Sequence, residues 1–258
     1  MDFKDHFQGK AVVITGAAGL FGRGLAQTFA AADARLCVTE RDQGALDALL
    51  DELNAPGLIA VAADLTSTPD LQALIAAVGQ AGGAPDIVIN NDAIYPSHFL
   101  LNMQIEDWDR MMDVNSRAPF VLMQSFAKMM IAAGHKGSFV NIGSGASRKM
   151  RMTAAAYCIS KTSLERLTKG MAQFGIRVNA LEPGFSAGSS VSRLTQEHIN
   201  RVTRAIPLGR TTSMADIGPA AIYLASDFAS YVTGTTLTVD GGNSIGTVDD
   251  FHEKKTPR

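Results

Sequence analysis

Two ionisable side chains lie one helical turn apart in a segment whose apolar residues recur at helical spacing. Tyr157 and Lys161 are four residues apart, so a helix presents them on one face. A phenol has a pKa of about 10, and a nearby ammonium group favours its ionised form. The pair therefore predicts a proton donor and acceptor. Of the four tyrosines, only Tyr157 has a lysine at this spacing.

This pair alone is a weak signal, because the same spacing arises by chance about as often as not in a chain of this length. Two further polar residues come from neighbouring elements. Ser144 follows a run that predicts a buried strand, and Asn115 lies within the helix that precedes that strand. Both can reach the crevice that Tyr157 and Lys161 would face.

A glycine-rich turn near the start predicts a second site. Gly16, Gly19 and Gly22 follow a strand-like run and open a helix that includes Leu20 and Phe21. Glycines at such a turn let the backbone approach a pyrophosphate, and the helix N-terminus offers unpaired N–H groups and positive dipole charge. The turn therefore predicts a dinucleotide site, with an ordinary tight turn as the alternative.

Polar residues at the ends of the next strands predict which dinucleotide binds. Glu40 ends the second strand, where a carboxylate can accept hydrogen bonds from the adenosine ribose and repel a 2′-phosphate. This favours NAD. Arg41 follows at once and can instead pair with that phosphate, so NADP use remains open. The third strand ends at Asp64 and Leu65, and the fourth ends at Asn91. These residues would line the same end of the crevice, or simply cap a turn.

The elements that position these residues alternate along the chain. Continuous apolar runs predict strands buried on both faces, at Ala11–Thr15, Arg35–Thr39, Leu58–Ala62, Asp86–Asn90, Gly137–Ile142, Ile176–Leu181 and Thr236–Val239. Helical spacing predicts helices at Leu20–Ala32, Gln43–Leu53, Pro69–Ala81, Glu106–Ala133, Thr153–Phe174 and Met214–Ser226. The order predicts an α/β fold, a doubly wound parallel sheet in a single domain of residues 1–258.

The least regular region is Phe185–Arg210, which follows a strand and leads to Pro207. Loops at the carboxyl edge of such a sheet bind ligands, so this segment is expected to be a substrate lid, with a plain surface connection as the alternative. Residues 243–258 are expected to form a C-terminal tail.

Composition excludes several classes of protein. The net charge is -2 and no long run of Lys or Arg occurs, which argues against nucleic acid and anionic membranes as partners. No stretch approaches the roughly 20 apolar residues of a membrane span, and the first ten residues carry no signal-peptide segment. Cys37 and Cys158 form neither a metal spacing nor a disulfide framework. A cytoplasmic protein without a metal is expected.

Together these motifs resemble those of the short-chain dehydrogenase/reductase family, in its short, single-domain form with a Rossmann-like fold. The similarity runs from about Phe3 to Gly242, and Ser144 precedes Tyr157 by thirteen residues. The matching segments are Thr15–Gly22, Asn90–Asn91, Met112–Asn115, Ser144, Tyr157 with Lys161, Arg177–Ala180, Pro183–Gly184 and Val239–Gly242.

The resemblance implies a role for each residue of the site. Tyr157 would transfer a proton to or from the substrate oxygen, and Lys161 would lower its pKa and bind the nicotinamide ribose. Ser144 would hydrogen-bond the reacting oxygen, and Asn115 would interrupt its helix and hold a water that connects Lys161 to solvent. Pro183, Gly184 and Ser186 would join the cofactor site. The implied reaction is hydride transfer between NAD(P) and a secondary alcohol or ketone.

Three departures from the family pattern stand out. Leu20 replaces a usual glycine, so the turn reads as three glycines spaced by two residues, as in extended sugar-nucleotide enzymes. Asp92-Ala93 replaces the usual Ala-Gly and places a carboxylate near the cofactor. Gly188 replaces a common threonine, for which Ser186, Ser189 or Ser190 can substitute.

The substrate side is less defined by the sequence. A basic segment from Arg148 to Met152 lies between Ser144 and Tyr157 and can attract an anionic substrate, or be a solvated loop. Substrate contacts are expected from Tyr95, His98, Ser144, Arg148, Met150 and Phe185. Two rival functions remain at this point, a dinucleotide-sensing regulator and a sugar-nucleotide epimerase.

Self-association is expected as a homodimer or homotetramer built on the two long helices. The segment Glu106–Ala133 carries more apolar residues than one sheet face can cover, among them Met111, Phe120, Leu122, Phe126, Met130 and Ile131. A second contact is expected near Tyr231–Gly242.

Overall fold

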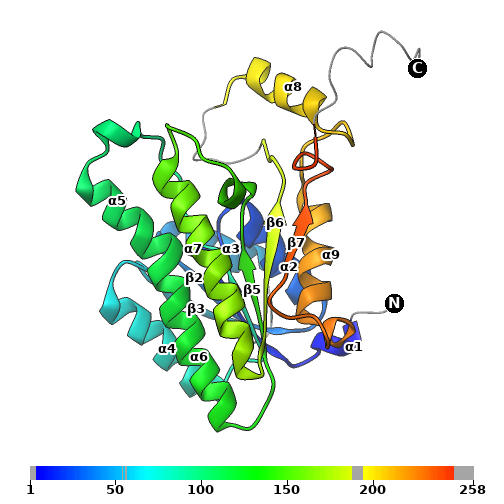
Figure 1. The fold of residues 1–258 in the computed structure, drawn as a ribbon. Coiled ribbons are helices and arrows are strands. Elements are labelled where there is room, and N and C mark those ends of the chain that lie inside the picture. Colours follow the sequence, from blue (N-terminus) through cyan, green and yellow to red (C-terminus); the bar gives the residue numbers. More distant parts are fainter. Residues whose placement is uncertain (1–3, 54, 56, 188–193, 247–258) are drawn as a thin grey trace.

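The computed structural model describes residues 4–53, 55, 57–187 and 194–246. Seven strands form one parallel sheet in the order β3-β2-β1-β4-β5-β6-β7 (Figure 1). The strands are β1 (Ala11–Thr15), β2 (Arg35–Glu40), β3 (Ile59–Ala62), β4 (Ile87–Asn90), β5 (Ser138–Ile142), β6 (Arg177–Pro183) and β7 (Thr236–Val239). The predicted doubly wound parallel sheet is confirmed.

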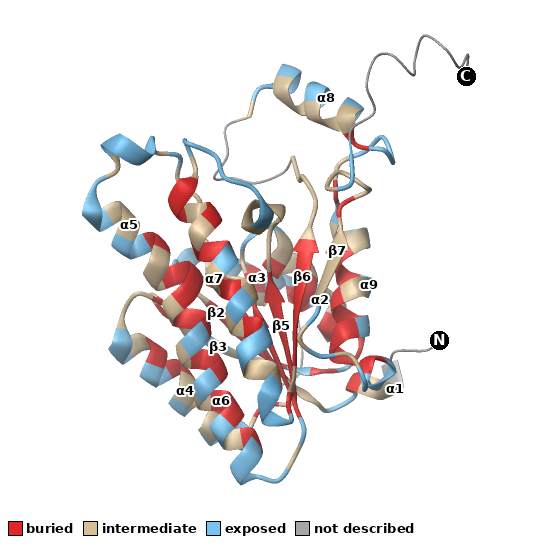
Figure 2. Ribbon diagram, in the orientation of Figure 1, coloured by how far each residue is buried: buried red, intermediate tan, exposed pale blue. Residues whose placement is uncertain are grey.

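The strand order reverses beside β1, and this reversal positions the site. β1 pairs with β2 on one side and with β4 on the other, with Val13 opposite both Cys37 and Val88. The connections from these strands therefore leave in opposite directions, which opens a crevice at the carboxyl ends of β1 and β4. The residues of β4 and β5 are all buried (Figure 2), as their continuous apolar runs predicted.

Helices cover both faces of the sheet (Figure 1). The cluster that contains Phe29, Leu49 and Ile217 packs one face, and the cluster that contains Leu74, Phe126 and Met130 packs the other. The first layer consists of α2 (Leu20–Ala31), α3 (Gln43–Leu53) and α9 (Met214–Ala225). The second consists of α4 (Thr68–Gly82), α5 (Ile105–Met112), α6 (Ala118–Ala132) and α7 (Ala155–Met171).

Two segments differ from the sequence predictions. The helix expected over Glu106–Ala133 is interrupted by a π-helical turn, Asp113–Arg117, between α5 and α6. The irregular segment expected over Phe185–Arg210 contains a helix, α8 (Gln196–Ala205), which Figure 1 shows above the carboxyl edge of the sheet. Thr195 caps α8 by accepting a hydrogen bond from the backbone of His198. Residues 188–193, which include Gly188, Ser189 and Ser190, lie outside the described residues. A short helix, α1 (Lys4–Phe7), precedes β1.

Most of the apolar surplus expected on the interrupted helix is buried within the protomer. Met111, Leu122, Phe126 and Met130 are buried, because they fill the space between the helices and the sheet. Phe120 and Ile131 remain exposed. The surplus that argued for self-association is therefore smaller than the sequence implied.

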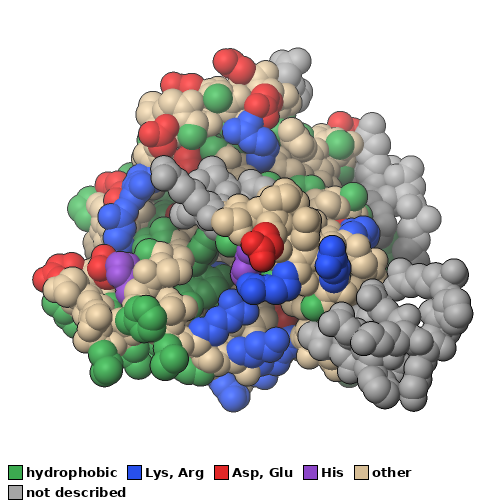
Figure 3. Space-filling model, turned by 90° about the horizontal axis from the view of Figure 1, so that it is seen from above, with side chains coloured by type: hydrophobic (Ala, Val, Ile, Leu, Met, Phe, Trp, Pro, Cys, Tyr) green, Lys and Arg blue, Asp and Glu red, His purple; other side chains and the backbone are tan. Residues whose placement is uncertain are grey.

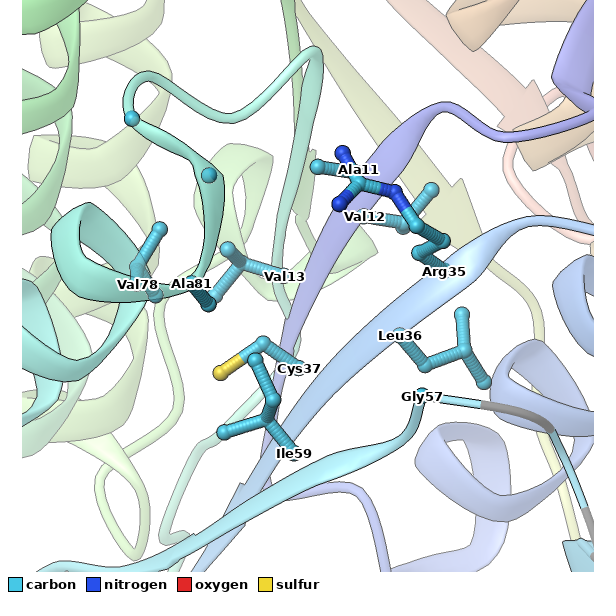
Figure 4. A pocket seen from close by; sticks show the side chains of 12 residues that line it. Ala11, Val12, Val13, Arg35, Leu36, Cys37, Gly57, Ile59, Val78 and Ala81 are labelled. Atoms are coloured by element: carbon cyan, nitrogen blue, oxygen red, sulfur yellow. The ribbon is translucent and has the colours of Figure 1, made fainter.

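A small cavity lies at the opposite edge of the sheet, between the start of β1 and the end of α4 (Figure 4). Its lining includes Val13, Arg35, Cys37 and Val78. Burial raises the pKa of Cys37 to about 12, so this thiol stays protonated and unreactive. Both cysteines are free.

In the described part of the chain, no helix combines the length and the apolar character that crossing a bilayer requires.

Candidate active site

The four predicted catalytic residues converge at the carboxyl edge of the sheet. Ser144 lies just after β5, Tyr157 and Lys161 lie on α7, and Asn115 lies in the π-helical turn. Between Ser144 and α7 the chain forms a short 3₁₀ helix, η3 (Gly145–Arg148), which Ser144 caps by accepting a hydrogen bond from the backbone of Ala146. The fold thus brings together side chains from three elements.

Tyr157 sits between Ser144 and a second aromatic ring. The Ser144 side chain lies close enough to favour the ionised form of its phenol. The ring of Tyr95 meets it edge-on with centroids 5.9 Å apart. Burial raises the pKa of the Tyr157 phenol, and the Ser144 side chain partly offsets this. The expected lowering of the Tyr157 pKa by Lys161 stays a prediction.

Lys161 is buried, and the backbone orients its ammonium group. Nζ donates a hydrogen bond of 2.8 Å to the carbonyl of Ile142, the last residue of β5. It lies 5.9 Å from the centroid of the Tyr157 ring. Burial lowers the pKa of Lys161 to about 8, against an opposing effect of the Asp92 carboxylate. The charge of this group therefore changes within an ordinary pH range.

Asn115 joins the loop after β4 to α7. Its Oδ1 accepts a hydrogen bond of 2.9 Å from the backbone N–H of Ile94, and its Nδ2 donates one of 2.8 Å to the carbonyl of the same residue. Nδ2 also donates to Ser160 Oγ at 3.0 Å, and that hydroxyl donates to the carbonyl of Tyr157. The expected interruption of the helix at Asn115 is confirmed. The water that this residue was expected to hold remains a prediction.

The glycine-rich turn has a backbone that side chains would obstruct. Gly16 has a φ of +59°, in the left-handed region that favours glycine. A Cβ atom on Gly22 would lie 2.1 Å from the carbonyl oxygen of Gly16. Gly19 is the N-cap residue of α2, and no side chain in the described part of the chain caps that helix. Its first N–H groups are therefore available to an anion, as the sequence predicted.

Asn91 braces this turn instead of facing a ligand with its amide nitrogen. Nδ2 donates hydrogen bonds of 2.9 Å to the carbonyls of Thr15 and Gly16, and the backbone N–H of Asn91 donates to Thr15 Oγ1. Asn91 therefore shapes the turn, and its expected place in the cofactor site stays a prediction.

A pocket opens directly beside the turn. It has an empty volume of about 530 Å³ and is lined by Leu20 and Phe21 on one side. Ser186 and Ala187, which follow β6, and residues 211–214, at the start of α9, line the other side. The structure therefore brings Leu20, Phe21 and Ser186 together around one space, as their assignment to one site requires.

The predicted adenosine end lies at the carboxyl ends of β2 and β3. Glu40 ends β2 with a partly exposed side chain that accepts a hydrogen bond from the backbone of Arg41. Burial opposes ionisation of Asp64, but hydrogen bonds from Thr66 and the charge of Arg41 lower the pKa of this carboxyl. Leu65 is buried in the core, so only its backbone can contribute to a cofactor site.

The segment after β6 contains a glycine that the fold requires. A Cβ atom on Gly184 would lie 2.5 Å from Thr212 Oγ1 and 2.6 Å from the Cα of Asp240. Pro183 ends β6 opposite Val239. This close packing directs the chain across the carboxyl edge toward the pocket beside the turn.

The expected substrate contacts have mixed outcomes. Tyr95 packs on Tyr157, and the ring of Phe185 lies 6.1 Å from that of His198 on α8. His98 Nε2 lies 3.6 Å from a carboxylate oxygen of Asp107. Arg148 pairs with the buried carboxylate of Glu182, so it is not a free cation at the rim. Met150 is exposed.

Sequence reasoning missed Glu182 and Ser160. Glu182 is buried next to the substrate loop, and in the described residues its Oε2 has no hydrogen-bond partner. No local signal marks Glu182, because its partner Arg148 lies 34 residues away. Ser160 follows Tyr157 by three residues, a helical spacing that could have suggested its role in orienting α7.

The residues present fit a nicotinamide dinucleotide. A turn that excludes Cβ atoms at Gly16 and Gly22 leaves backbone N–H groups for a pyrophosphate. Carboxylates follow at the adenosine end, and the tyrosine and lysine lie at the other end of the same sheet edge. Such an arrangement can bind the cofactor along the edge and perform acid/base chemistry at one end of it.

Comparisons with known proteins agree with this arrangement. The family model described as enoyl-(acyl carrier protein) reductase matches residues 16–244. Galactitol 2-dehydrogenase (L-tagatose-forming) of Cereibacter sphaeroides is 34% identical over 95% of this chain and 100% of that protein. The 3-oxoacyl-[acyl-carrier-protein] reductase of Escherichia coli is 30% identical over 92% of this chain and 98% of that protein.

Solved structures show the same fold. A short-chain type dehydrogenase/reductase from Mycobacterium marinum superposes with a TM-score of 0.86 and 28% identity, over 94% of this chain and 99% of that one. A protein assigned as an NAD(P)-dependent gluconate 5-dehydrogenase from Beutenbergia cavernae, with bound NADP, superposes with a TM-score of 0.85 and 32% identity. The match covers 93% of this chain and 98% of that one.

All four relatives are dehydrogenases or reductases, which favours an oxidoreductase over the regulator and epimerase alternatives. The chain belongs to the short-chain dehydrogenase/reductase family, as an NAD(P)-dependent oxidoreductase that interconverts an alcohol and a ketone.

Proposed function

We propose that Tyr157 is the acid/base of this reaction, supported by Ser144, Lys161 and Asn115. The observation that carries the proposal is the position of Tyr157 beside Ser144 and one helical turn from the buried Lys161 ammonium group, which lies 5.9 Å from the centroid of the Tyr157 ring. In the oxidative direction, the ionised Oη of Tyr157 takes the proton of the substrate hydroxyl while Ser144 holds the same oxygen. A bound nicotinamide cofactor would supply the hydride acceptor.

Lys161 and Asn115 prepare this proton transfer. The ammonium of Lys161 stabilises the negative charge that develops on the Tyr157 oxygen and binds the nicotinamide ribose. Asn115 fixes α7 through Ser160 and holds the water that links Lys161 to solvent. The proposed proton path thus runs from Tyr157 to solvent by way of Lys161.

The proposed cofactor site extends from the α2 N-terminus in both directions. Gly16, Gly19 and Gly22, with the backbone of Leu20 and Phe21, would hold the pyrophosphate. Pro183, Gly184 and Ser186 would hold the nicotinamide end. At the adenosine end, Glu40 accepts the ribose hydroxyls, with Arg41, Asp64, Leu65 and Asn91 forming its surroundings. NAD is the preferred cofactor, and NADP use is possible through Arg41.

The substrate is proposed to be a polyhydroxylated secondary alcohol. Support comes from relatives named as galactitol, sorbitol and gluconate dehydrogenases. The segment of residues 185–210, with α8, would close over the substrate. Tyr95, His98 and Phe185 are proposed to line the pocket.

A second candidate substrate has an apolar chain, because the rim of the site is apolar. The loop after β4 and the loop after η3 are joined by backbone hydrogen bonds, including Leu100 N–H to the Met152 carbonyl. Exposed apolar side chains on them are Phe99, Leu100, Leu101, Met150 and Met152. Figure 3 shows hydrophobic side chains beside Lys and Arg side chains on this face. A hydroxyacyl thioester fits such a rim.

An oxidation assay tests both substrate classes. The purified enzyme is incubated with NAD and one candidate substrate at a time. The first set is galactitol, sorbitol and gluconate, and the second set is 3-hydroxyacyl thioesters. NADH formation is followed by absorbance. Turnover of a polyol supports the first proposal, and turnover of only the thioesters replaces it with the second. No turnover of any secondary alcohol, with either cofactor, would contradict both.

Self-association as a homodimer or homotetramer is also proposed. Exposed Phe120 and Ile131 on α6 can contribute to one contact. Near β7, Tyr231 is fully exposed, and Tyr223 and Phe228 are partly exposed, which supports a second contact. A dimer or tetramer mass by light scattering at micromolar concentration is the expected result, and a monomer mass would contradict it.

A cytoplasmic location is proposed as well. The two free cysteines, Cys37 and Cys158, fit a reducing compartment. Fractionation of cells that express the tagged protein should recover it with cytoplasmic markers. Recovery in a secreted or membrane fraction would overturn this assignment.

A further inference from the structure

Asp92 is a carboxylate in the cofactor cleft that the proposed reaction does not use. Its backbone N–H donates a hydrogen bond of 3.0 Å to Thr15 Oγ1, which fixes it beside the glycine-rich turn. A Cβ atom on Gly16 would lie 2.8 Å from the Cα and 3.0 Å from Oδ1 of Asp92. The carboxylate therefore packs against the first glycine of the turn that would receive the pyrophosphate.

The charged groups around Asp92 come from both ends of the cleft. Glu40 and Arg41 act on it from the end of β2, and Lys161 acts on it from α7. The turn after β1, through Thr15 and Gly16, contributes no charged side chain. Asp92 is thus coupled to the adenosine end and to the catalytic lysine at once.

We propose that Asp92 is a specificity-determining residue, which disfavours a 2′-phosphorylated dinucleotide and makes cofactor affinity depend on its own protonation. The inference rests on the proposed cofactor site. It adds to Glu40 a second carboxylate that repels phosphate groups.

The effect of Asp92 on the dinucleotide is electrostatic. A pyrophosphate carries negative charge, and a 2′-phosphate adds about two further negative charges at neutral pH. Because Asp92 packs against the turn that would receive the pyrophosphate and its charge also acts on Glu40 at the adenosine end, ionised Asp92 repels both groups, and NADP more strongly than NAD. Arg41 offsets part of this repulsion, since its positive charge opposes the negative charge of Asp92.

The direction of the pH effect follows from the environment of Asp92. Burial and the charge of Glu40 raise the pKa of Asp92 to about 6, against the opposing charges of Lys161 and Arg41. The carboxyl is therefore ionised at neutral pH and neutral below about pH 5. Repulsion decreases as the pH falls through this range, so dinucleotide affinity rises.

The test compares Asp92→Asn with the wild type by fluorescence titration of NADH and NADPH. Asp51→Asn is the matched control, because Asp51 is an exposed carboxylate on α3 and the net charge changes equally. Asp92→Ala is a second variant in case the amide forms new hydrogen bonds. The binding titrations are done at about pH 5.5 and about pH 7.5. Both values lie below the Lys161 pKa of about 8, so Lys161 stays mostly protonated in both. Thermal melting checks that each variant is folded.

At the higher pH, Asp92→Asn and Asp92→Ala are expected to tighten NADPH binding about tenfold, and NADH binding by less. The wild type and Asp51→Asn should bind NADH about threefold more tightly at the lower pH, whereas the Asp92 variants should not respond. An unchanged ratio of NADPH to NADH affinity, or weaker NADH binding in both folded Asp92 variants, would overturn the proposal. Failure of the wild type to bind either dinucleotide would instead refute the cofactor site.

Discussion

The two ends of the proposed cofactor cleft are built differently. At the adenosine end, Glu40 and Asp64 are partly exposed and Arg41 is exposed, at the ends of strands. At the catalytic end, Lys161, Asn115 and Ser160 are buried, and each is held by hydrogen bonds to the backbone or to another side chain. The first end presents charges to solvent, and the second encloses them.

This difference predicts how each end responds to mutation. Solvent and salt screen exposed charges, so changes at the adenosine end should alter cofactor preference by modest factors. Buried groups interact more strongly, because little water screens them. Changes at the catalytic end should therefore have large effects on turnover and on stability.

The largest effect is expected for Tyr157→Phe, which removes the proton carrier and keeps the ring. Turnover should fall by about 10²- to 10⁴-fold, the usual contribution of acid/base catalysis. The affinity for NADH should change little, because the ring still packs on Tyr95. Steady-state kinetics and fluorescence titration measure the two quantities. Near-normal turnover would show that another group is the acid/base.

Lys161→Ala should reduce both turnover and cofactor affinity, with turnover lower by about 10²-fold. Lys161 would then serve both proton transfer and cofactor binding, whereas Tyr157 would serve proton transfer alone. Lys161→Arg, which keeps the charge, is the matched variant and should retain more NADH affinity than alanine. If both variants bound NADH as tightly as the wild type, the proposed contact with the ribose would be wrong.

In the wild-type enzyme, the affinity for the dinucleotide should also depend on pH through the charge of Lys161. Because the pKa of Lys161 is lowered to about 8, its ammonium group loses a proton as the pH rises through that value. Affinity for the anionic dinucleotide should then decrease above about pH 8, and this decrease should be absent in Lys161→Ala. An identical alkaline profile in the two proteins would assign the effect to another group.

Asn115→Ala tests whether the buried end is held by its hydrogen bonds. The substitution leaves the N–H and C=O of Ile94 and the hydroxyl of Ser160 without this partner. The free energy of unfolding should fall by about 1–3 kcal/mol, the range for unsatisfied buried polar groups. Denaturant unfolding measures it, with exposed Asn102→Ala as the control. Equal stability of Asn115→Ala and the wild type would contradict this bracing role.

The smallest effect is expected at the adenosine end. Glu40→Gln removes one exposed charge, so the ratio of kcat/KM for NADP to that for NAD should rise by about three- to tenfold. Asp51→Asn should leave the ratio unchanged. A wild type that already prefers NADP would reverse the assignment and point to Arg41 as the determinant.

Much of the fold could be predicted because its signals are local. The strands and most helices were predicted within about two residues, since continuous apolar runs and helical spacing reflect burial directly. The π-helical turn was missed as an element, although the resemblance implied an interruption at Asn115. The α8 helix was also missed, because its polar sequence buries no residue in the core.

The sequence by itself determined the glycine-rich turn, the parallel sheet and the pairing of Tyr157 with Lys161 on one helix face. The turn and the helical pair depend on residues at most a few positions apart, whose geometry the backbone dictates, and the parallel sheet follows from the alternation of buried strands with helices. Only the tertiary structure decided that Asn91 braces the turn, that Arg148 is occupied by Glu182, and that burial raises the pKa of Tyr157. These properties arise from contacts between distant segments and from the exclusion of water, which no local pattern encodes.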